Sequence, residues 1–333
     1  MTGLARRAFI GSSIGTALTG LFAARSGATS PEPMTVAAGL EFPEGLCPLA
    51  DGTLLFVEIA GGRLGRITPD GRVETVALLG GGPNGCAIGP DGNAYVTNNG
   101  GLAFRHLADG RQAVAGISAD YAGGAIQRVD LATGRFETLY AHCGAYGLKG
   151  PNDIVFDGGP GFWFTDTGKI RPRDRDQGGL YWAKTDGSEI REVAYPLNAP
   201  NGIALSPDRK QVWVALSDKR QVVAFDIVGP GLLREVGGVP VSRVIASPAG
   251  AFSIDNIAVE AGAGLVLSAV GTGAVVGLDP QGQTCETRLL GDPVVTCPAF
   301  DRRNPHRLYV ALSSTGRIVR IDWPRAGARP VYC

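Results

Sequence analysis

The chain has 333 residues, among them 50 glycines and 22 prolines, and its 31 basic side chains balance its 31 acidic ones. A hydrophobic share of 44% can form a large core, which excludes an intrinsically disordered chain apart from the ends. Because the net charge is zero, the chain lacks the basic face with which nucleic-acid-binding proteins displace counterions, and we expect no nucleic-acid partner.

Residues 1–33 have the features of an export signal. The pair Arg6-Arg7 precedes a weakly apolar stretch over residues 11–24, and residues 26–28 form a small-x-small cleavage pattern. This arrangement resembles a twin-arginine (Tat) signal, so we expect the Tat export machinery as a partner, a periplasmic location and no stable membrane span in the mature form. The alternative is an uncleaved leader that tethers the chain to a membrane or is disordered.

From residue 40 onward one pattern recurs six times: a polar residue, a small apolar run, a glycine-containing turn and a β-rich run. The repeats start at residues 44, 84, 152, 201, 255 and about 296. This spacing is typical of four-stranded propeller blades with loop insertions, and no helix-length amphipathic period competes with it. We predict an all-β, six-bladed β-propeller as a single domain over residues 34–333. A strand over Met34–Ala38 would complete the last blade, which otherwise has three strands.

The repeat starts are equivalent positions, so a closed propeller would bring them together around its central axis. The residues there are Glu44, Asn84, Asn152, Asn201, Asp255 and Thr296. Converging oxygen donors without His or Cys suit one hard divalent cation such as Ca²⁺, Mg²⁺ or Mn²⁺. The competing interpretation is that the Asx-Gly pairs are turn residues that hydrogen-bond their own backbone, although Glu44 is not a favoured turn former.

Strand alternation places the longest insertions above this ring. They cover residues 98–124 and the run from Asp166 to Gly178, and the segment before Asn152 adds His142, Tyr146 and Lys149. The charge run from Lys169 to Asp176 is read as a solvated loop. The alternative is that Lys169 or Arg171 holds a substrate. The chain has only three histidines, so few residues could serve as the base of a Ser-His-Asp mechanism.

Four motifs in a fixed order carry a family resemblance. They are Phe42-Pro-Glu-Gly, Gly150-Pro-Asn-Asp-Ile-Val-Phe-Asp, Ala199-Pro-Asn-Gly-Ile-Ala-Leu-Ser-Pro-Asp and Val295-Thr-Cys. Together they resemble the senescence marker protein / gluconolactonase / luciferin-regenerating enzyme family, which includes regucalcin and bacterial sugar lactonases. The resemblance implies a six-bladed propeller with one divalent metal, often calcium, in its central channel.

The resemblance also implies roles for individual residues. Glu44, Asn152, Asn201 and Asp255 match the metal ligands of the family. Asp255 would also act as general base, and Asn152 would touch the substrate as well as the metal. We further assign substrate binding to Asn84, Lys149 and Tyr146. Two departures put the substrate in question: Ile254-Asp-Asn-Ile stands where many members have Pro-Asp-Gly, and Gly150 stands where regucalcin-type members have Arg.

The expected activity is hydrolytic opening of a sugar-type lactone by a metal-dependent, gluconolactonase-like enzyme. The metal would polarise the lactone carbonyl while Asp255 takes a proton from water. Two alternatives remain: a hydrolase of esters or phosphotriesters like diisopropylfluorophosphatase, and a non-catalytic propeller with a structural ion. Strictosidine-synthase-like propellers share the architecture, but their catalytic Glu has no clear counterpart in this chain.

Overall fold

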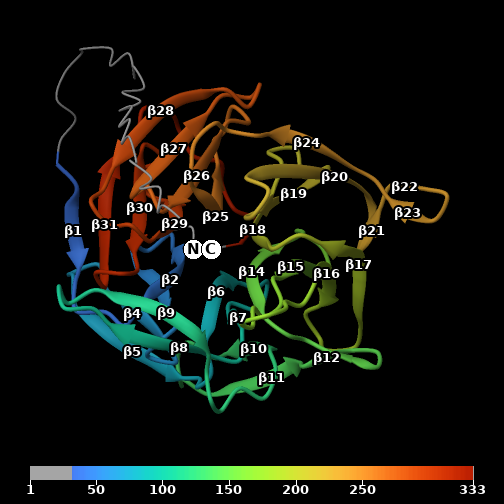
Figure 1. Ribbon diagram of the computed structural model, residues 1–333, viewed down its shortest axis with the longest axis horizontal. Helices are drawn as coiled ribbons and strands as arrows, with labels where there is room; N and C mark the ends of the chain where they lie inside the picture. Colours follow the sequence, from blue (N-terminus) through green and yellow to red (C-terminus); the bar gives the residue numbers. More distant parts are fainter. Residues whose placement is uncertain (1–31, 333) are drawn as a thin grey trace, which may run out of the picture. The chain divides into compact units, whose positions relative to one another are not determined.

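The computed structural model describes residues 32–332, which form six antiparallel sheets arranged around a central axis and contain no helix (Figure 1). The inner strands are β2 (Pro43–Pro48), β6 (Pro83–Ile88), β14 (Pro151–Phe156), β18 (Pro200–Leu205), β25 (Ser253–Val259) and β29 (Val295–Phe300). The second strands are β3 (Leu54–Glu58), β7 (Ala94–Asn98), β15 (Gly161–Asp166), β19 (Gln211–Leu216), β26 (Leu265–Val270) and β30 (Arg307–Leu312). The six-bladed, all-β prediction is confirmed.

The outer half of each blade completes a four-stranded meander. The third strands are β4 (Arg63–Ile67), β10 (Ala125–Val129), β16 (Gly178–Lys184), β20 (Gln221–Gly229), β27 (Ala274–Leu278) and β31 (Arg317–Asp322). The fourth strands are β5 (Val73–Leu78), β11 (Phe136–Tyr140), β17 (Ile190–Leu197), β24 (Ser242–Ala246), β28 (Thr284–Leu289) and β1 (Met34–Ala37). Within residues 32–332 no helix is long and apolar enough to cross a bilayer. The export signal predicted for residues 1–33 lies almost entirely outside the described residues.

The last blade is closed by the first strand of the described chain. Strand β1 pairs antiparallel with β31, with Met34 opposite Arg320 and Thr35 opposite Val319. The sheet order is therefore β1-β31-β30-β29, and the strand expected over Met34–Ala38 is present over Met34–Ala37. The pairing closes the ring and leaves no end blade with an incomplete sheet.

Each blade is buried on both faces because its neighbours pack against it. In β15 the side chains alternate between the two sides, as the period of a strand requires. Trp163 packs in a cluster with residues of blade 4 such as Val214, whereas Phe162 and Phe164 pack in a cluster with Tyr95 of blade 2. A continuous apolar run therefore indicates a strand whose two faces are both covered by neighbouring blades.

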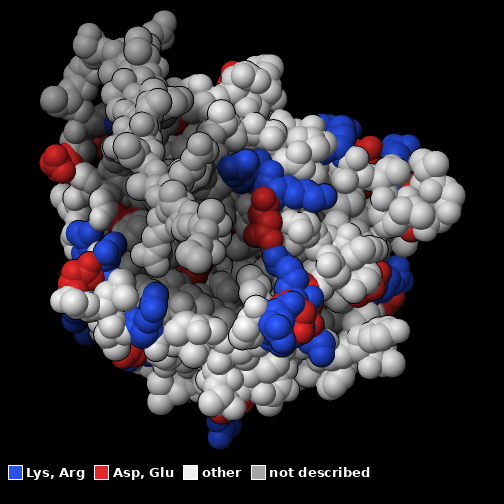
Figure 2. All heavy atoms as spheres, viewed as in Figure 1, with Lys and Arg blue, Asp and Glu red and all other residues white. Residues whose placement is uncertain are grey.

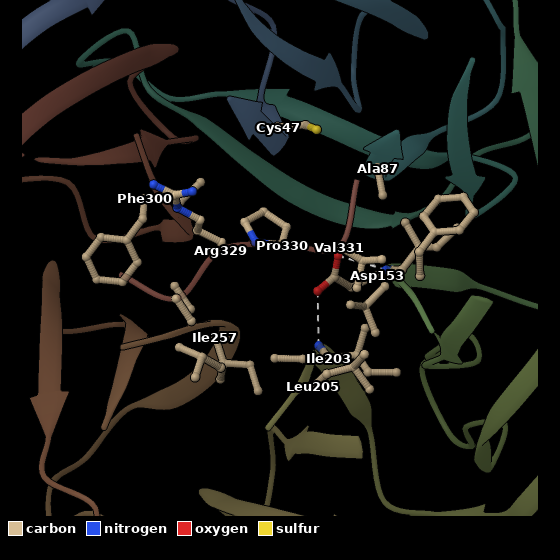
Figure 3. A pocket seen from close by; sticks show the side chains of 18 of the residues that line it. Cys47, Ala87, Asp153, Ile203, Leu205, Ile257, Phe300, Arg329, Pro330 and Val331 are labelled. Carbon is tan, nitrogen blue, oxygen red and sulfur yellow. Dashed lines mark hydrogen bonds between the residues drawn. The ribbon is translucent and has the colours of Figure 1, made fainter. Parts of the chain in front are cut away.

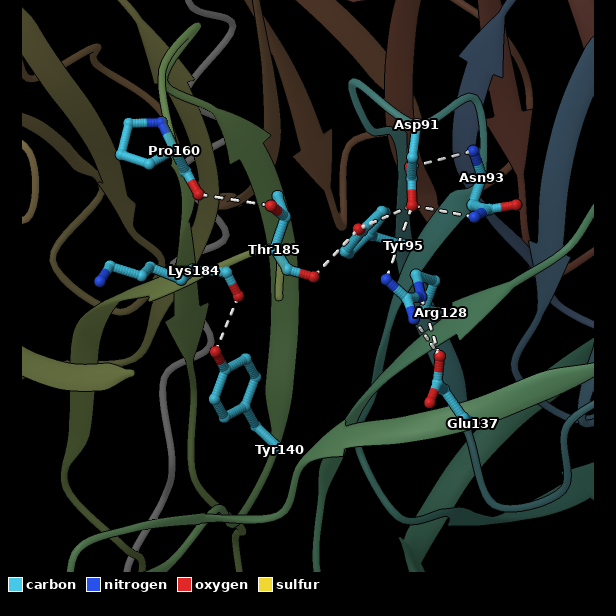
Figure 4. A network of polar contacts seen from close by, with 9 residues as sticks. All are labelled: Asp91, Asn93, Tyr95, Arg128, Glu137, Tyr140, Pro160, Lys184 and Thr185. Atoms are coloured by element: carbon cyan, nitrogen blue, oxygen red, sulfur yellow. Dashed lines mark hydrogen bonds and ion pairs between the residues drawn. The ribbon is translucent and has the colours of Figure 1, made fainter. Parts of the chain in front are cut away.

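Polar contacts near the outer side add to the packing between blades 2 and 3 (Figure 4). The Tyr95 hydroxyl donates to Thr185 O at 3.3 Å or to Asp91 Oδ2 at 3.1 Å. The Tyr140 hydroxyl lies 2.7 Å from Lys184 O and 2.9 Å from Glu189 O. These two tyrosines therefore connect the second blade to backbone carbonyls of the third.

The substitution Tyr140→Phe should lower the free energy of unfolding by about 1 kcal/mol, because the hydroxyl is removed and its buried carbonyl partners lose a donor. Urea unfolding followed by fluorescence measures the change. Tyr146→Phe is the control, since the Tyr146 side chain is exposed. An equal loss in both variants would show that the contacts of the Tyr140 hydroxyl do not stabilise the fold.

One insertion crosses between blades that are not adjacent. The hairpin of β8 (Leu102–His106) and β9 (Gln112–Ile117) leaves blade 2. Phe104 packs on Phe42, with 4.9 Å between ring centroids, and Gln112 N donates to Ser314 O at 2.7 Å. The hairpin thus reaches from blade 2 over blade 1 to blade 6.

The remaining short strands lie in two places. A smaller hairpin, β12 (His142–Cys143) with β13 (Tyr146–Gly147), precedes blade 3. Blade 4 is extended by β21 (Leu232–Leu233), β22 (Glu235–Val236) and β23 (Val239–Pro240).

Candidate functional site

The six inner strands share a break in register at the positions singled out from the sequence. In β2 the regular pairing with β3 is interrupted between Glu44 and Cys47, and each of the other five inner strands has a corresponding irregularity. A bulge turns a side chain out of the regular alternation. Each inner strand also contacts the next one, and β29 contacts β2, so the six positions form a ring around the axis.

Hydroxyl groups in the second strands, or directly after them, hold the inner strands of neighbouring blades in place. Four such bonds are Thr97 Oγ1 to Asn152 O at 2.5 Å, Thr165 Oγ1 to Asn201 O at 2.5 Å, Ser217 Oγ to Ile254 O at 2.6 Å and Ser313 Oγ to Pro43 O at 2.6 Å. Each hydroxyl bonds a carbonyl of the next blade, and the last bond joins blade 6 to blade 1. The backbone at the ring is therefore fixed from blade to blade.

Glu44 is a buried carboxylate in this ring. Its side chain is 2% exposed, and Oε2 accepts from Gly45 N at 2.6 Å and from Asn256 Nδ2 at 3.3 Å. Burial, followed by the negative charge of Asp255, raises the pKa of Glu44 well above its usual value. A cation close to both carboxylates would stabilise their charged forms.

Asp255 faces the same space from blade 5. Loss of hydration raises the pKa of Asp255 to about 7, and a hydrogen bond from the Asn201 amide opposes this shift. The negative charge of Asp153 adds a smaller upward contribution. The Asn201 amide therefore donates its N–H group to Asp255 and leaves its own oxygen available.

Two carboxamide oxygens in the ring lack a hydrogen-bond donor among residues 32–332. They are Asn152 Oδ1 and Asn201 Oδ1, and both atoms are buried. The interpretation of these residues as turn formers that bond their own backbone does not fit, because both lie inside strands and their side-chain oxygens accept nothing. A buried oxygen without a donor is costly unless something else satisfies it.

These groups fit a hard cation. Two carboxylates and two carboxamide oxygens are the donors that Ca²⁺ and Mg²⁺ prefer. Residues 32–332 contain no group of three or more His, Cys, Asp or Glu side chains placed to hold a metal, so a metal site here would depend on the carboxamides. The presence of the metal stays a prediction.

Two residues next to the ring were not selected from the sequence. Asp153 accepts from Ile203 N at 3.0 Å and from Ile154 N at 2.9 Å, and burial raises its pKa to about 6. Asn256 is 3% exposed and its Oδ1 has no donor. Each directly follows a predicted ligand, Asn152 or Asp255, and their position after the repeat starts is the signal that could have identified them.

The three predicted substrate-binding residues differ in their placement. Asn84 is buried in β6, at the position equivalent to Asn152 and Asn201. Tyr146 and Lys149 are exposed, and within residues 32–332 neither side chain forms a hydrogen bond or ion pair with the ring. The Lys149 backbone N–H donates to Asp166 Oδ2 at 2.7 Å. The substrate contacts of all three residues stay predictions.

The charge run after β15 is only partly a solvated loop. Lys169 is 3% exposed, and its Nζ donates to Asn99 Oδ1 at 3.2 Å and Gly101 O at 3.1 Å. Arg171 pairs with Asp176 at 2.9 Å and also with Asp174. Lys169 therefore ties this loop to blade 2. Figure 2 shows Lys and Arg side chains next to Asp and Glu side chains on the face of the protein seen in Figure 1.

Lys169 should give the protein a measurable pH dependence. Burial lowers the pKa of Lys169 to about 8, whereas the unfolded chain holds this proton to about 10.5. Between these values the unfolded state binds more protons, so the contribution of Lys169 to stability rises with pH, by at most about 3 kcal/mol. The free energy of unfolding of the wild type minus that of Lys169→Met should therefore increase from pH 8 to pH 10.5.

Lys219→Met is the matched control, because Lys219 is exposed in the turn after β19. A flat difference between the wild type and Lys169→Met across this pH range would contradict the inferred proton loss.

Comparisons with known proteins found a matching family model and several similar proteins. The family model described as SMP-30/Gluconolactonase/LRE-like region matches residues 42–314. The chain is 29% identical over 198 residues to lactonase drp35 of Staphylococcus saprophyticus. This alignment covers 57% of this chain and 52% of that protein. It is 23% identical over 205 residues to a gluconolactonase of Zymomonas mobilis, covering 55% of this chain and 51% of that protein. The chain spans about half the length of these curated relatives.

Solved structures show the same fold. A gluconolactonase of Xanthomonas campestris aligns with a TM-score of 0.68 and 24% identity, over 88% of this chain and 89% of that one. A calcium-binding protein, regucalcin, of Agrobacterium tumefaciens aligns with a TM-score of 0.69 and 16% identity, over 91% of this chain and 98% of that one. At this level of identity the similarity supports the propeller fold.

Proposed function

Because the chain belongs to the SMP-30/gluconolactonase/LRE-like family, we propose that it is a metal-dependent lactonase that opens a sugar-type lactone by hydrolysis. The observation that carries the proposal is the pair of buried, unpartnered oxygens of Asn152 and Asn201 beside the carboxylates of Glu44 and Asp255. The names lactonase and gluconolactonase among the relatives support the reaction class.

One divalent cation would be held by Glu44, Asn152, Asn201 and Asp255, and their all-oxygen donors favour Ca²⁺. When bound, the cation supplies a Lewis acid that polarises the lactone carbonyl and stabilises its developing negative charge. The two carboxamides hold their positions without adding negative charge.

Asp255 is the residue proposed to move the proton. Its carboxylate accepts a proton from the attacking water, and the new C–O bond forms at the lactone carbonyl carbon. The same carboxyl returns the proton to the ring oxygen as the ester bond breaks, which gives the open hydroxy acid. The Asn201 N–H that bonds Asp255 would fix the orientation of this carboxylate.

The location of the enzyme is also a proposal. The arginine pair Arg6-Arg7 and the apolar stretch after it support export by a twin-arginine-type signal to the periplasm. Such signals carry proteins that fold before export, which suits a protein that would bind a metal inside a closed ring.

Hydrolysis of a substrate panel tests the function. The panel contains glucono-, galactono- and xylonolactone, one aryl ester and one phosphotriester, and proton release is followed at constant pH. We expect turnover of one lactone class, loss of this turnover after chelation, and recovery with Ca²⁺, Mg²⁺, Mn²⁺ or Zn²⁺. Hydrolysis of the phosphotriester alone would replace the lactonase proposal with a diisopropylfluorophosphatase-like activity. Turnover that survives complete metal removal would refute the metal dependence.

A further inference from the structure

The end of the central channel opposite the strand starts holds a cavity of about 460 Å³. We call it the lower cavity: it is lined by the second halves of the inner strands and by residues 328–332 of the C-terminal segment. Its walls are mainly aliphatic and aromatic, and they include Ile88, Ile154, Ile203, Leu205, Ile257 and Phe300. This size is within the range of small-molecule sites, about 300–1,000 Å³, and the lining is of the usual kind.

The C-terminal segment forms one side of this cavity. Ala328 N donates to Val259 O at 2.8 Å, and Tyr332 packs edge-on against Phe156 with 5.6 Å between centroids. Figure 3 shows Arg329, Pro330 and Val331 following one another across the cavity, from the side of Phe300 towards Asp153. The segment therefore runs from blade 5 to blade 3 across the lower end of the channel.

The rim of the lower cavity carries two arginines without acidic partners. Arg209 and Arg329 both line the cavity and are exposed. Within residues 32–332 neither guanidinium forms a hydrogen bond or an ion pair, in contrast to Arg307, which pairs with Asp301 at 3.2 Å. Unpaired guanidinium groups beside an apolar cavity are complementary to a carboxylate attached to an apolar chain.

Two polar side chains, Asp153 and Asn256, line the inner end of the lower cavity. The oxygens of Asp153 already accept the backbone N–H groups of Ile203 and Ile154. Asn256 also lines the cavity, its side chain is 3% exposed, and its Oδ1 has no donor among residues 32–332. A buried amide oxygen in this position requires a donor, and the hydroxyl group of a ligand is a neutral donor that would satisfy it.

We propose that the lower cavity binds a hydroxy carboxylate with an apolar chain. The carboxylate lies between Arg209 and Arg329, the chain lies along the aliphatic walls, and a hydroxyl remote from the carboxylate donates to Asn256 Oδ1. This site uses none of the four proposed metal ligands, and it meets the proposed hydrolytic site at Asn256, whose Nδ2 donates to Glu44 Oε2 at 3.3 Å.

Isothermal titration of the full-length protein with straight-chain ω-hydroxy acids of increasing length tests the proposal, with unsubstituted acids and diols of the same lengths for comparison. We expect an optimum chain length, with the hydroxy acid binding about tenfold more tightly than either the acid or the diol, as one hydrogen bond or ion pair of this kind provides. Equal affinities for all three ligands, or no binding of any of them, would overturn the proposal.

Variants locate the site. The double substitution Arg209→Ala with Arg329→Ala should weaken hydroxy-acid binding about tenfold, whereas Arg105→Ala, an exposed arginine on β8, should have no effect. Ala87→Phe should block binding by filling the cavity, and Asn256→Ala should abolish the preference for the hydroxy acid. Circular dichroism identifies any variant that fails to fold, and unchanged binding in the folded double arginine variant and in folded Ala87→Phe would refute this location.

Discussion

Replacement of Asp255 by asparagine is expected to lower kcat/KM for the lactone by at least about a thousandfold. Asparagine keeps the shape of the side chain but cannot accept the proton of the attacking water, and loss of a general base alone costs about 10²- to 10⁴-fold. The substitution also removes one of the two ring carboxylates, so weaker metal binding should add to the loss. Proton release measured at saturating metal separates the two effects. Added metal compensates for weaker metal binding, but it does not restore the turnover that is lost with the general base.

Asp322→Asn is the matched control for this experiment. Asp322 is an exposed aspartate at the end of β31, far along the chain from the ring, and its loss should leave kcat/KM unchanged. If Asp255→Asn retains near-wild-type turnover with metal bound, another group removes the proton and Asp255 has no part in the chemistry.

The substitution Gly202→Ala should destabilise the protein by about 3 kcal/mol. Gly202 follows Asn201 in β18, and a Cβ at this position would lie 2.6 Å from Asn256 Cα, 2.8 Å from Asp255 O and 2.8 Å from Ile257 N. All three atoms belong to the backbone of the next inner strand, so a side-chain rotation cannot relieve the clash. The methyl group must push β25 away from β18, which would also move Asp255 relative to Asn201.

Guanidinium chloride unfolding measures this loss, and Gly262→Ala is the control. A methyl group on Gly262 would meet no heavy atom within 4 Å, so alanine should be neutral or slightly stabilising there. Lactone turnover should fall in Gly202→Ala under conditions where the variant is still folded. A stable and fully active Gly202→Ala variant would mean that the inner strands can separate without cost to the ring.

Much of the propeller could be predicted because its repeats leave clear marks in the sequence. The positions of Glu44, Asn84, Asn152 and Asn201 fall at equivalent points of four inner strands, each one residue after a proline. The closing strand was predictable for a simple reason: the last repeat contains three strands, and an unpaired edge requires a partner.

Other parts of the site depend on contacts between blades. Thr97 and Thr165 occupy the same place in their strands, but only the twist and spacing of the blades bring each hydroxyl to a carbonyl of the next blade. Lys169 looks exposed because it begins a run of charged residues, yet the fold of the insertion in blade 2 places Asn99 and Gly101 around its amine. Local composition does not contain this information.

The pairing of β1 with β31 has a consequence for how the protein folds. Residues near the start of the described chain complete a sheet whose other strands come from its end, so the contact has nearly the largest sequence separation that the chain allows. Such high contact order slows folding, and the last blade cannot form until synthesis reaches Asp322. Five blades must therefore remain an open arc with an unprotected edge during translation, and this arc is the form most exposed to aggregation and proteolysis.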